Sequence, residues 1–349
     1  MKRTKSSKPL AEQMKQSSSK KPKKQEQDGS TEIMISTGST LLDLAISGGR
    51  VKGGGIPAGI LVEIFGPSAA GKTVLLCEIA GDVQRKKGQI MFHDPEARLN
   101  KQFAQMFDLD TQAMDYTTPN TIPEVFNAVR HWDVETEGKQ VNGVFADSLA
   151  ALSTDLEMGS DEGDKMGMRR AKEFSEELRR TARILAERNL LMVCSNQVRE
   201  SHEQYGPKYR SPGGLAIGFY ASLRIRLSSA QKIYQKQKVA GKEVKRVIGI
   251  KTEAEVFKSS VWKPHRTAPL TILFDYGIDD IRENLQFIKD YTKNTVYTLG
   301  GENLDKSMER SIQIIEDDAR LIKQLKQEVM ELWTEIEDKF TSDRKPKQR

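Results

Sequence analysis

The feature that most constrains this chain is an eight-residue segment, 66–73, that matches the phosphate-binding pattern G-x-x-x-x-G-K-[ST] in full. It follows the apolar run 61–65 and precedes a helix-like stretch, which is the context that gives the pattern meaning. Glycines let backbone N–H groups close around phosphates, Lys72 can reach the β- and γ-phosphates, and the Thr73 hydroxyl can ligate Mg²⁺. The segment therefore predicts a site for ATP and Mg²⁺ formed by Gly66, Pro67, Ser68, Ala69, Ala70, Gly71, Lys72 and Thr73.

A phosphate-binding loop of this kind needs a second carboxylate to order Mg²⁺, placed at the end of a neighbouring strand. Asp147 follows the apolar run 144–146 and is the candidate for this role. Asp94 also ends an apolar run, and Glu96 lies just beyond it, where a carboxylate could polarise the attacking water. An ordinary charge at the start of a helix is the alternative interpretation of Glu96.

Strand-like and helix-like segments alternate through most of the chain. Strands are expected at 61–65, 89–92, 141–146, 190–194 and 223–227, and helices at 73–87, 101–107, 123–134 and 168–188. Such alternation predicts an α/β fold with a mostly parallel central sheet covered by helices on both faces.

The pattern becomes helical beyond Asp275. A short helix is expected at 281–291, and the stretch 304–340 contains neither Gly nor Pro. Apolar residues recur there at sevenfold spacing, which is compatible with a coiled-coil partner, but a core-facing amphipathic helix is the preferred interpretation. The expected organisation is a disordered basic tail (1–31), a core that contains the phosphate-binding segment (32–278), a small helical C-terminal domain (279–341) and a basic tail (342–349).

The net charge of +6 is concentrated at the N-terminus. Residues 1–24 hold nine basic groups against Glu12, which leaves the rest of the chain at −2. This tail has few large apolar residues, so we expect disorder, with either a purely solubilising role or non-specific phosphate contacts. No apolar run approaches the ~18 residues of a membrane span and no signal peptide is evident, so we expect a cytoplasmic protein with no membrane partner. Cys77 and Cys194 are expected to be reduced core residues.

Several motifs in the same order resemble bacterial RecA and its phage relatives. They are 35–39, 62–67, 147–152, 196–199, Gly213-Gly214 and 219–224, and the resemblance is collinear from about Ile35 to Ile278. It implies a RecA-like P-loop core and a DNA-dependent ATPase that self-associates into helical filaments on single-stranded DNA and exchanges strands with a homologous duplex. It also assigns Glu96 as the catalytic glutamate beside Lys72, and Gln197 as the residue that senses the γ-phosphate and couples it to a DNA-binding loop.

Two segments resemble the DNA-binding loops of that family. The first, 157–167, is acidic, so the expected phosphate contacts are its basic neighbours Lys165, Arg169 and Arg170. The second, 198–212, interleaves cations with aromatic residues, which suits single-strand binding because charges follow phosphates while rings stack on bases. The residues expected to bind DNA there and just beyond are Arg199, Tyr205, Lys208, Arg210, Gly213 and Gly214. A surface loop with no DNA contact is the alternative.

The chain departs from the family pattern in two places. In the family, two lysines separated by one residue reach the nucleotide of the neighbouring subunit. This chain keeps one of them as Lys258 and has Ser260 in place of the other. Lys263 is a candidate substitute for the missing lysine. The N-terminus does not resemble the family's polymerisation helix. The replacement at Ser260 keeps open a RecA-like mediator with slow hydrolysis as an alternative. A ring-forming helicase with the same core is the other alternative, and the loop around Tyr205 and the segment 219–222 argue against it.

Overall fold

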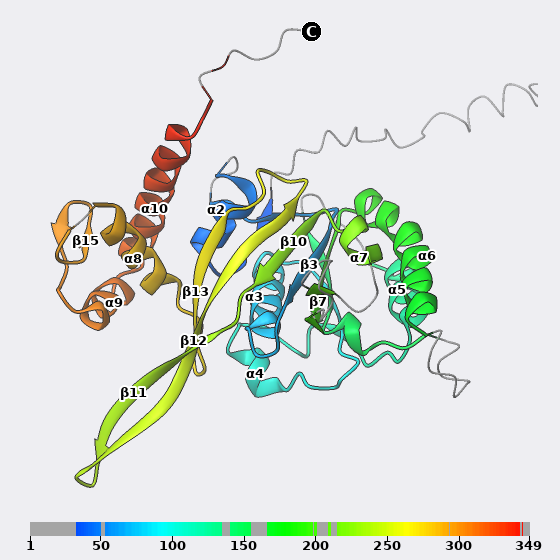
Figure 1. The fold of residues 1–349 in the computed structure, drawn as a ribbon, viewed down its shortest axis with the longest axis horizontal. Coiled ribbons are helices and arrows are strands. Elements are labelled where there is room, and N and C mark those ends of the chain that lie inside the picture. Colours follow the sequence, from blue (N-terminus) through cyan, green and yellow to red (C-terminus); the bar gives the residue numbers. More distant parts are fainter. Residues whose placement is uncertain are drawn as a thin grey trace, which may run out of the picture. The chain divides into compact units, whose positions relative to one another are not determined.

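A ten-stranded sheet forms the centre of the molecule (Figure 1). The computed structural model describes residues 33–49, 53–134, 140–154, 166–197, 199–200, 209–210, 215–292, 294–342 and 344. Within them the strand order is β14-β13-β12-β10-β3-β7-β6-β4-β5, and β11 pairs with β12 alone. In this part of the chain, no helix has the length and apolar character needed to cross a membrane.

Six neighbouring strands are parallel and make up the nucleotide-site half of the sheet. They are β10 (Leu223–Leu227), β3 (Leu61–Gly66), β7 (Leu190–Gln197), β6 (Asn142–Ala146), β4 (Ile90–His93) and β5 (Asp115–Thr117). Five of them were predicted from apolar runs, whereas β5 is exposed along its length and gives no such signal.

Helices cover both faces of the parallel strands, as predicted. Alternate residues of β7 show this, because successive side chains of a strand point to opposite faces. Leu191 and Val193 belong to the apolar core that contains α3 (Lys72–Arg85), and Leu190 and Met192 belong to the core that contains α5 (Ile122–His131) and α6 (Met166–Glu187). The core side chains of Cys77 and Cys194 are fully buried free thiols, and burial raises the pKa of each.

The other half of the sheet is antiparallel and was not predicted. Strand β12 (Lys242–Ser259) pairs antiparallel with β10, with β13 (Thr267–Leu273) and with β11 (Gln231–Val239), and β13 pairs with β14 (Gly277–Ile278). The β11–β12 hairpin extends away from the sheet (Figure 1). The sheet is therefore mixed, and its parallel half leads into the phosphate-binding segment 66–73, called the P-loop below.

The C-terminal stretch forms two helices, α9 (Met308–Glu316) and α10 (Ala319–Lys339), after α8 (Asp280–Thr292). The Asp318 side chain caps α10 by accepting a hydrogen bond from the Arg320 N–H, so the sevenfold repeat is interrupted between the two helices. Ile315, Leu325 and Val329 are buried in the same apolar core as α2 (Thr40–Ser47). The core-facing interpretation is thus confirmed.

The remaining elements are short. They are β1 (Met34–Ile35), β2 (Ile56–Pro57), α4 (Lys101–Gln105), the 3-10 helix η1 (Leu149–Ala151), β8 (Arg199–Glu200), β9 (Tyr209–Arg210), α7 (Leu215–Tyr220), β15 (Thr298–Leu299) and β16 (Glu302–Asn303).

Candidate functional site

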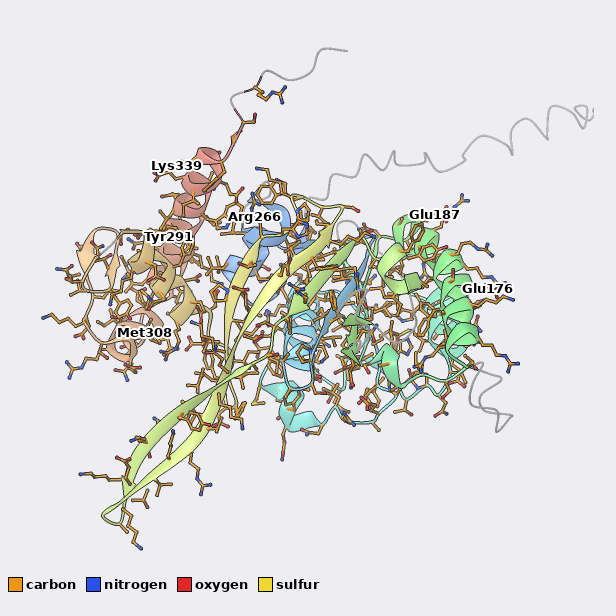
Figure 2. All side chains as sticks on the ribbon, viewed as in Figure 1. Glu176, Glu187, Arg266, Tyr291, Met308 and Lys339 are labelled. Carbon is orange, nitrogen blue, oxygen red and sulfur yellow. The ribbon has the colours of Figure 1, made fainter. Side chains whose placement is uncertain are left out.

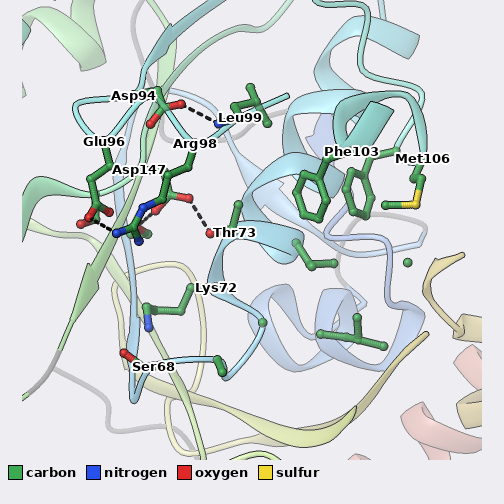
Figure 3. A pocket seen from close by; sticks show the side chains of 18 of the residues that line it. Ser68, Lys72, Thr73, Asp94, Glu96, Arg98, Leu99, Phe103, Met106 and Asp147 are labelled. Atoms are coloured by element: carbon green, nitrogen blue, oxygen red, sulfur yellow. Dashed lines mark hydrogen bonds and ion pairs between the residues drawn. The ribbon is translucent and has the colours of Figure 1, made fainter. Parts of the chain in front are cut away.

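A cavity of about 520 Å³ lies where the carboxyl ends of β3, β4, β6 and β7 meet (Figure 3). Ligands of open α/β sheets bind at this edge because parallel strands bring the residues that follow them together. The polar wall of the cavity is formed by Ser68, Lys72, Thr73, Asp94, Glu96, Asp147 and Gln197. The structure therefore places the predicted metal-binding and catalytic residues around one cavity, together with five of the eight residues of the phosphate-binding segment 66–73.

The P-loop connects β3 to α3, and two of its glycines have no room for a side chain. A Cβ on Gly66 would lie 2.5 Å from the Leu227 carbonyl oxygen. Gly71 caps α3 with φ +94°, and a Cβ there would lie 2.4 Å from Ile272 Cδ1. Close packing against β10 and β13 thus fixes the loop at the helix N-terminus, where backbone N–H groups can bind an anion.

The Lys72 side chain is held against the P-loop by backbone carbonyl groups of that loop. Its Nζ donates to the oxygens of Gly66, at 3.1 Å, and Pro67, at 2.6 Å. Burial lowers the pKa of Lys72, and the nearby carboxylate of Asp147 opposes that shift. A cation is therefore placed in the wall of the cavity beside Ser68 (Figure 3).

Asp147 and Thr73 form the oxygen-rich part of the site. Thr73 Oγ1 donates to Asp147 Oδ2 at 2.6 Å, and the Ser195 hydroxyl donates to the other carboxylate oxygen of Asp147. Mg²⁺ prefers oxygen ligands and keeps several of its waters when it is bound with substrate phosphates. The adjacent oxygens of Thr73 and Asp147 fit this ion. Ser195 was missed by the sequence analysis, since its position at the end of β7 has no distinctive spacing from Asp147.

Glu96 lies on the loop that follows β4 and pairs with Arg98. Arg98 Nη2 is 2.9 Å from Glu96 Oε1, and the Glu96 side chain is 25% exposed. Asp94 holds this loop, because its Oδ2 accepts hydrogen bonds from the Leu99 N–H at 2.8 Å and from the Tyr116 hydroxyl at 2.9 Å. Burial, followed by the bond to Asp94, raises the pKa of Tyr116 to about 12. Neither Arg98 nor Tyr116 was predicted from the sequence.

Gln197 is the last residue of β7, lies in register with Gly66 and lines the cavity. The residue before it, Asn196, donates from Nδ2 to Glu63 Oε1 at 3.0 Å. The Glu63 side chain is fully buried and pairs with Arg224 Nε at 2.6 Å, as a buried carboxylate requires. This network links β7, β3 and β10 through side chains and holds the strand residue directly before Gln197.

The opposite wall of the cavity is apolar. Phe103 and Phe107 meet there edge to face with ring centroids 5.0 Å apart, and Met106 and Phe274 lie on the same lining. Aromatic and thioether side chains of this kind pack well against a flat ring. The cavity thus offers cationic and hydroxyl groups at the P-loop and an apolar surface that suits a nucleobase.

His93, the last residue of β4, is buried just before Asp94. Its Nδ1 shares a hydrogen bond of 2.7 Å with Thr117 Oγ1, and its Nε2 has no hydrogen-bond partner among the described residues. Burial lowers the pKa of His93 from 6.5 to about 4. Between these values the unfolded chain binds a proton that the folded chain does not, so the free energy of unfolding falls as pH falls through this window.

We expect His93→Leu to remove this pH dependence. The shift corresponds to about 3 kcal/mol at 1.36 kcal/mol per pKa unit, so the parental protein should lose about that much more stability than the variant between pH 7 and 4. Urea unfolding of both proteins at the two pH values measures the difference. Equal losses in the two proteins would show that His93 does not titrate as proposed.

The predicted DNA contacts are only partly described by the structure. Lys165, Tyr205, Lys208, Gly213 and Gly214 lie outside the described residues. The backbones of Arg199 and Arg210 face each other in the β8–β9 pair, and Arg169 is exposed on α6. Arg170 donates to the carbonyl oxygens of Leu149, at 3.3 Å, and Ala150, at 2.5 Å. All these contacts remain predictions, although the Arg170 guanidinium is already engaged by η1.

Lys258 does not line the cavity of its own chain. Its Nζ donates to the carbonyl oxygens of Gly218, at 3.0 Å, and Phe219, at 2.9 Å, at the C-terminal end of α7, and burial lowers its pKa. Lys263 lies 3.5 Å from Glu337 Oε2 on α10. A role for either lysine at a neighbour's nucleotide stays a prediction.

The chain is similar in sequence to known proteins over most of its length. The family model described as the RecA N-terminal domain matches residues 12–279. Protein RecA of Thermus thermophilus is 30% identical over 308 residues, which are 87% of this chain and 86% of that protein. Protein RecA of Deinococcus radiodurans is 29% identical over 302 residues (85% and 79%), and that of Acholeplasma laidlawii is 27% identical over 301 residues (84% and 86%). The family match includes every strand of the large sheet.

Proposed function

This chain belongs to the RecA family, and we propose that it is a DNA-dependent ATPase that forms filaments on single-stranded DNA and catalyses homologous pairing and strand exchange. The observation that carries the proposal is the convergence of Lys72, Thr73, Asp147, Glu96 and Gln197 on one cavity. Gln197 directly precedes a segment that resembles a DNA-binding loop, so nucleotide and DNA would be sensed by adjacent residues.

Each residue of the cavity has a distinct role in this proposal. The P-loop N–H groups and Lys72 bind the triphosphate, and Thr73 and Asp147 hold Mg²⁺. When bound, Mg²⁺ neutralises phosphate charge. Glu96 orients a water molecule for attack on the γ-phosphate and accepts a proton from that water. For this, the Glu96 carboxylate must release Arg98 and bind the water instead.

Gln197 provides the coupling between the two ligands. A side-chain amide can donate a hydrogen bond to a phosphate oxygen, and a change in its position moves the chain that follows it. The Asn196–Glu63–Arg224 network fixes the strand up to Gln197, so movement is directed into the residues beyond the strand. Bound ATP would thus order the DNA-binding loop, and hydrolysis would release it.

Strand exchange itself needs little energy from ATP. One duplex is replaced by another with the same base pairs, so the exchange is nearly isoenergetic, much like the duplex replacement in an R-loop. Hydrolysis therefore serves to release DNA and to recycle subunits.

The test is an exchange reaction between single-stranded DNA and a homologous linear duplex, with ATP and Mg²⁺. We expect joint molecules with the homologous duplex and none with a heterologous duplex of equal length. Unwinding of a duplex without a homologous strand would favour the ring helicase. DNA binding with neither exchange nor appreciable hydrolysis would favour the mediator. The mediator is kept as a second candidate because Ser260 replaces the second interface lysine.

We expect Tyr205→Ala to weaken single-strand binding or to block pairing. Loss of one stacked ring removes about 1 to 3 kcal/mol of base contact. Basal ATP hydrolysis without DNA should survive, because the cavity residues are unchanged. Affinity for labelled single-stranded DNA, strand exchange and basal hydrolysis measure these effects on folded protein, and normal binding with normal exchange would refute the role of Tyr205.

A further inference from the structure

Two cations, Lys72 and Arg98, line the cavity at the P-loop, and the described part of the chain places no third cation there. Lys72 is held by the carbonyl oxygens of Gly66 and Pro67 on the P-loop. Arg98 lies on the loop that follows β4, where its guanidinium meets Glu96 (Figure 3). A bound phosphate group can therefore be approached by a second positive charge, from the Glu96 side of the cavity.

The fold does not depend on Arg98. Its side chain is 73% exposed, and its one partner among the described residues is Glu96, with Nη2 2.9 Å from Oε1. An ion pair this exposed contributes little to stability, since water solvates both charges and two side chains lose freedom in forming it. Packing and stability thus give no reason for an arginine at this position.

The backbone around Arg98 is fixed, whereas its exposed side chain can rotate. Asp94 holds the loop in two places, because its carboxylate accepts a hydrogen bond from the Leu99 N–H at 2.8 Å and its carbonyl oxygen accepts one from the Ala97 N–H at 3.0 Å. Ala97 has φ 50°, a left-handed conformation that a non-glycine residue keeps only where its surroundings impose it. The guanidinium can therefore leave Glu96 by rotation about side-chain bonds, with no rearrangement of the loop.

The position of Arg98 places it beside the terminal phosphate of a bound nucleotide. A P-loop lysine reaches the β- and γ-phosphates, so Lys72 marks their place in the cavity. In the proposed function Glu96 orients the water that attacks the γ-phosphate, and a group paired with Glu96 thus lies next to that phosphate. A guanidinium offers two parallel N–H donors that match phosphate oxygens, and the γ-phosphate carries more negative charge than one carboxylate. ATP would therefore draw Arg98 away from Glu96.

We infer that Arg98 is a catalytic residue, which leaves Glu96 when ATP binds and donates hydrogen bonds to the γ-phosphoryl oxygens during hydrolysis. The inference rests on the proposed function for the use of this cavity in ATP hydrolysis. The water oxygen forms a bond to the γ-phosphorus while the bond from that phosphorus to the bridging oxygen breaks. The electron pair of the broken bond stays on ADP, and Glu96 accepts a proton from the water. Arg98 neither gives nor takes a proton, and it stabilises the negative charge that spreads over the γ-phosphoryl oxygens in the transition state.

The same movement makes Glu96 available to the water. While Arg98 pairs with Glu96, the carboxylate is engaged by a cation. ADP has no γ-phosphate to attract the guanidinium, so it leaves the pair intact. A single arginine would thus release the catalytic carboxylate only when there is a phosphoryl group to transfer.

The test compares the full-length protein with Arg98→Gln, which keeps a polar side chain without the charge, and Arg98→Lys, which keeps the charge without the fork of N–H donors. Arg320→Gln is the matched control, because Arg320 is also an exposed arginine paired with a carboxylate two residues before it, Asp318 at 2.8 Å. It lies on α10, the helix that ends at Lys339 in Figure 2. Three quantities are measured: turnover under saturating ATP, affinity for ADP, and affinity for ADP with fluoroaluminate, which stands for the phosphoryl group in transit.

Arg98→Gln should reduce turnover by about 10² to 10³, the effect of removing one preorganised donor from the transition state. Affinity for ADP with fluoroaluminate should fall by a similar factor, while affinity for ADP alone should match the control. Arg98→Lys should lie between Arg98→Gln and the parental protein in both turnover and fluoroaluminate binding. Turnover in Arg98→Gln equal to or above that of the control would overturn the inference, because Arg98 would then only restrain Glu96.

A second comparison separates direct action from an effect through Glu96. Added to Glu96→Gln, Arg98→Gln should weaken fluoroaluminate binding by the same factor as in the parental background. No further weakening would make Arg98 a positioning residue for Glu96 and would also overturn the inference. Hydrolysis that ignores single-stranded DNA would contradict the proposed DNA dependence instead. In that case the fluoroaluminate comparison still decides the role of Arg98, because such binding requires neither DNA nor turnover.

Discussion

Replacing Lys72 with alanine is expected to abolish ATP hydrolysis. The Lys72 ammonium lies in the cavity wall, where two loop carbonyls hold it, and no shorter side chain can place a positive charge there. Preorganised donors act in a site that excludes water, so removing one costs about 10² to 10³ in turnover. Lys72 also contributes to binding the ground-state phosphates, so nucleotide affinity should fall as well.

Steady-state hydrolysis with single-stranded DNA, together with nucleotide binding by calorimetry, measures both effects. Lys339→Ala is the matched control, since Lys339 is exposed on α10 and pairs only with Glu335 among the described residues. Thermal unfolding of both variants establishes that they fold. Parental turnover in Lys72→Ala would mean that the cavity is not the hydrolytic site.

Glu96→Gln is expected to keep nucleotide and DNA binding while reducing hydrolysis by about 10² to 10⁴. The amide preserves the size of the side chain but cannot accept the proton of the attacking water. It also loses the charge attraction to Arg98, whose Nη2 lies 2.9 Å from the carboxylate. Because ATP would stay bound and intact, complexes with single-stranded DNA should persist longer than those of the parental protein.

Two measurements test this expectation: turnover under saturating ATP and the lifetime of the DNA complex after dilution. Glu302→Gln, at an exposed position on β16, controls for the loss of one carboxylate. Turnover close to the parental rate would reduce Glu96 to a structural partner of Arg98, and the catalytic base would have to be sought elsewhere.

The parallel half of the fold was predictable because its strands are short apolar runs and its helices have one apolar face. Strand β10 has the predicted bounds, and α6 begins within two residues of the prediction. The β11–β12 hairpin was missed for the opposite reason. Strand β11 is mostly Lys and Gln and has no buried face that would generate an alternating pattern.

The division between α9 and α10 was missed, although its local signal is present in the sequence. Asp317-Asp318 interrupts the stretch, and Asp318 caps α10. The sevenfold spacing of Ile315, Ile322 and Val329 obscured this boundary, because the same spacing arises when two separate helices each pack one face on a core.

In the candidate site, motifs identified the residues that would contact nucleotide but not those that position them. Thr73 and Asp147 come from recognisable segments, whereas Ser195 and Arg98 carry no motif. The Glu63–Arg224 pair joins positions 161 residues apart and depends on β3 and β10 being neighbours. Such partners follow from the strand order, which sequence periodicity does not determine.

The most direct test of the central claim is the rate of ATP hydrolysis by the full chain, with Mg²⁺, in the presence and absence of single-stranded DNA. The proposed coupling through Gln197 predicts that single-stranded DNA raises the turnover number and that a variant lacking the Glu96 carboxylate shows no such rise. A chain that binds ATP but hydrolyses it at one rate, whether or not single-stranded DNA is present, would contradict the proposed DNA-dependent ATPase.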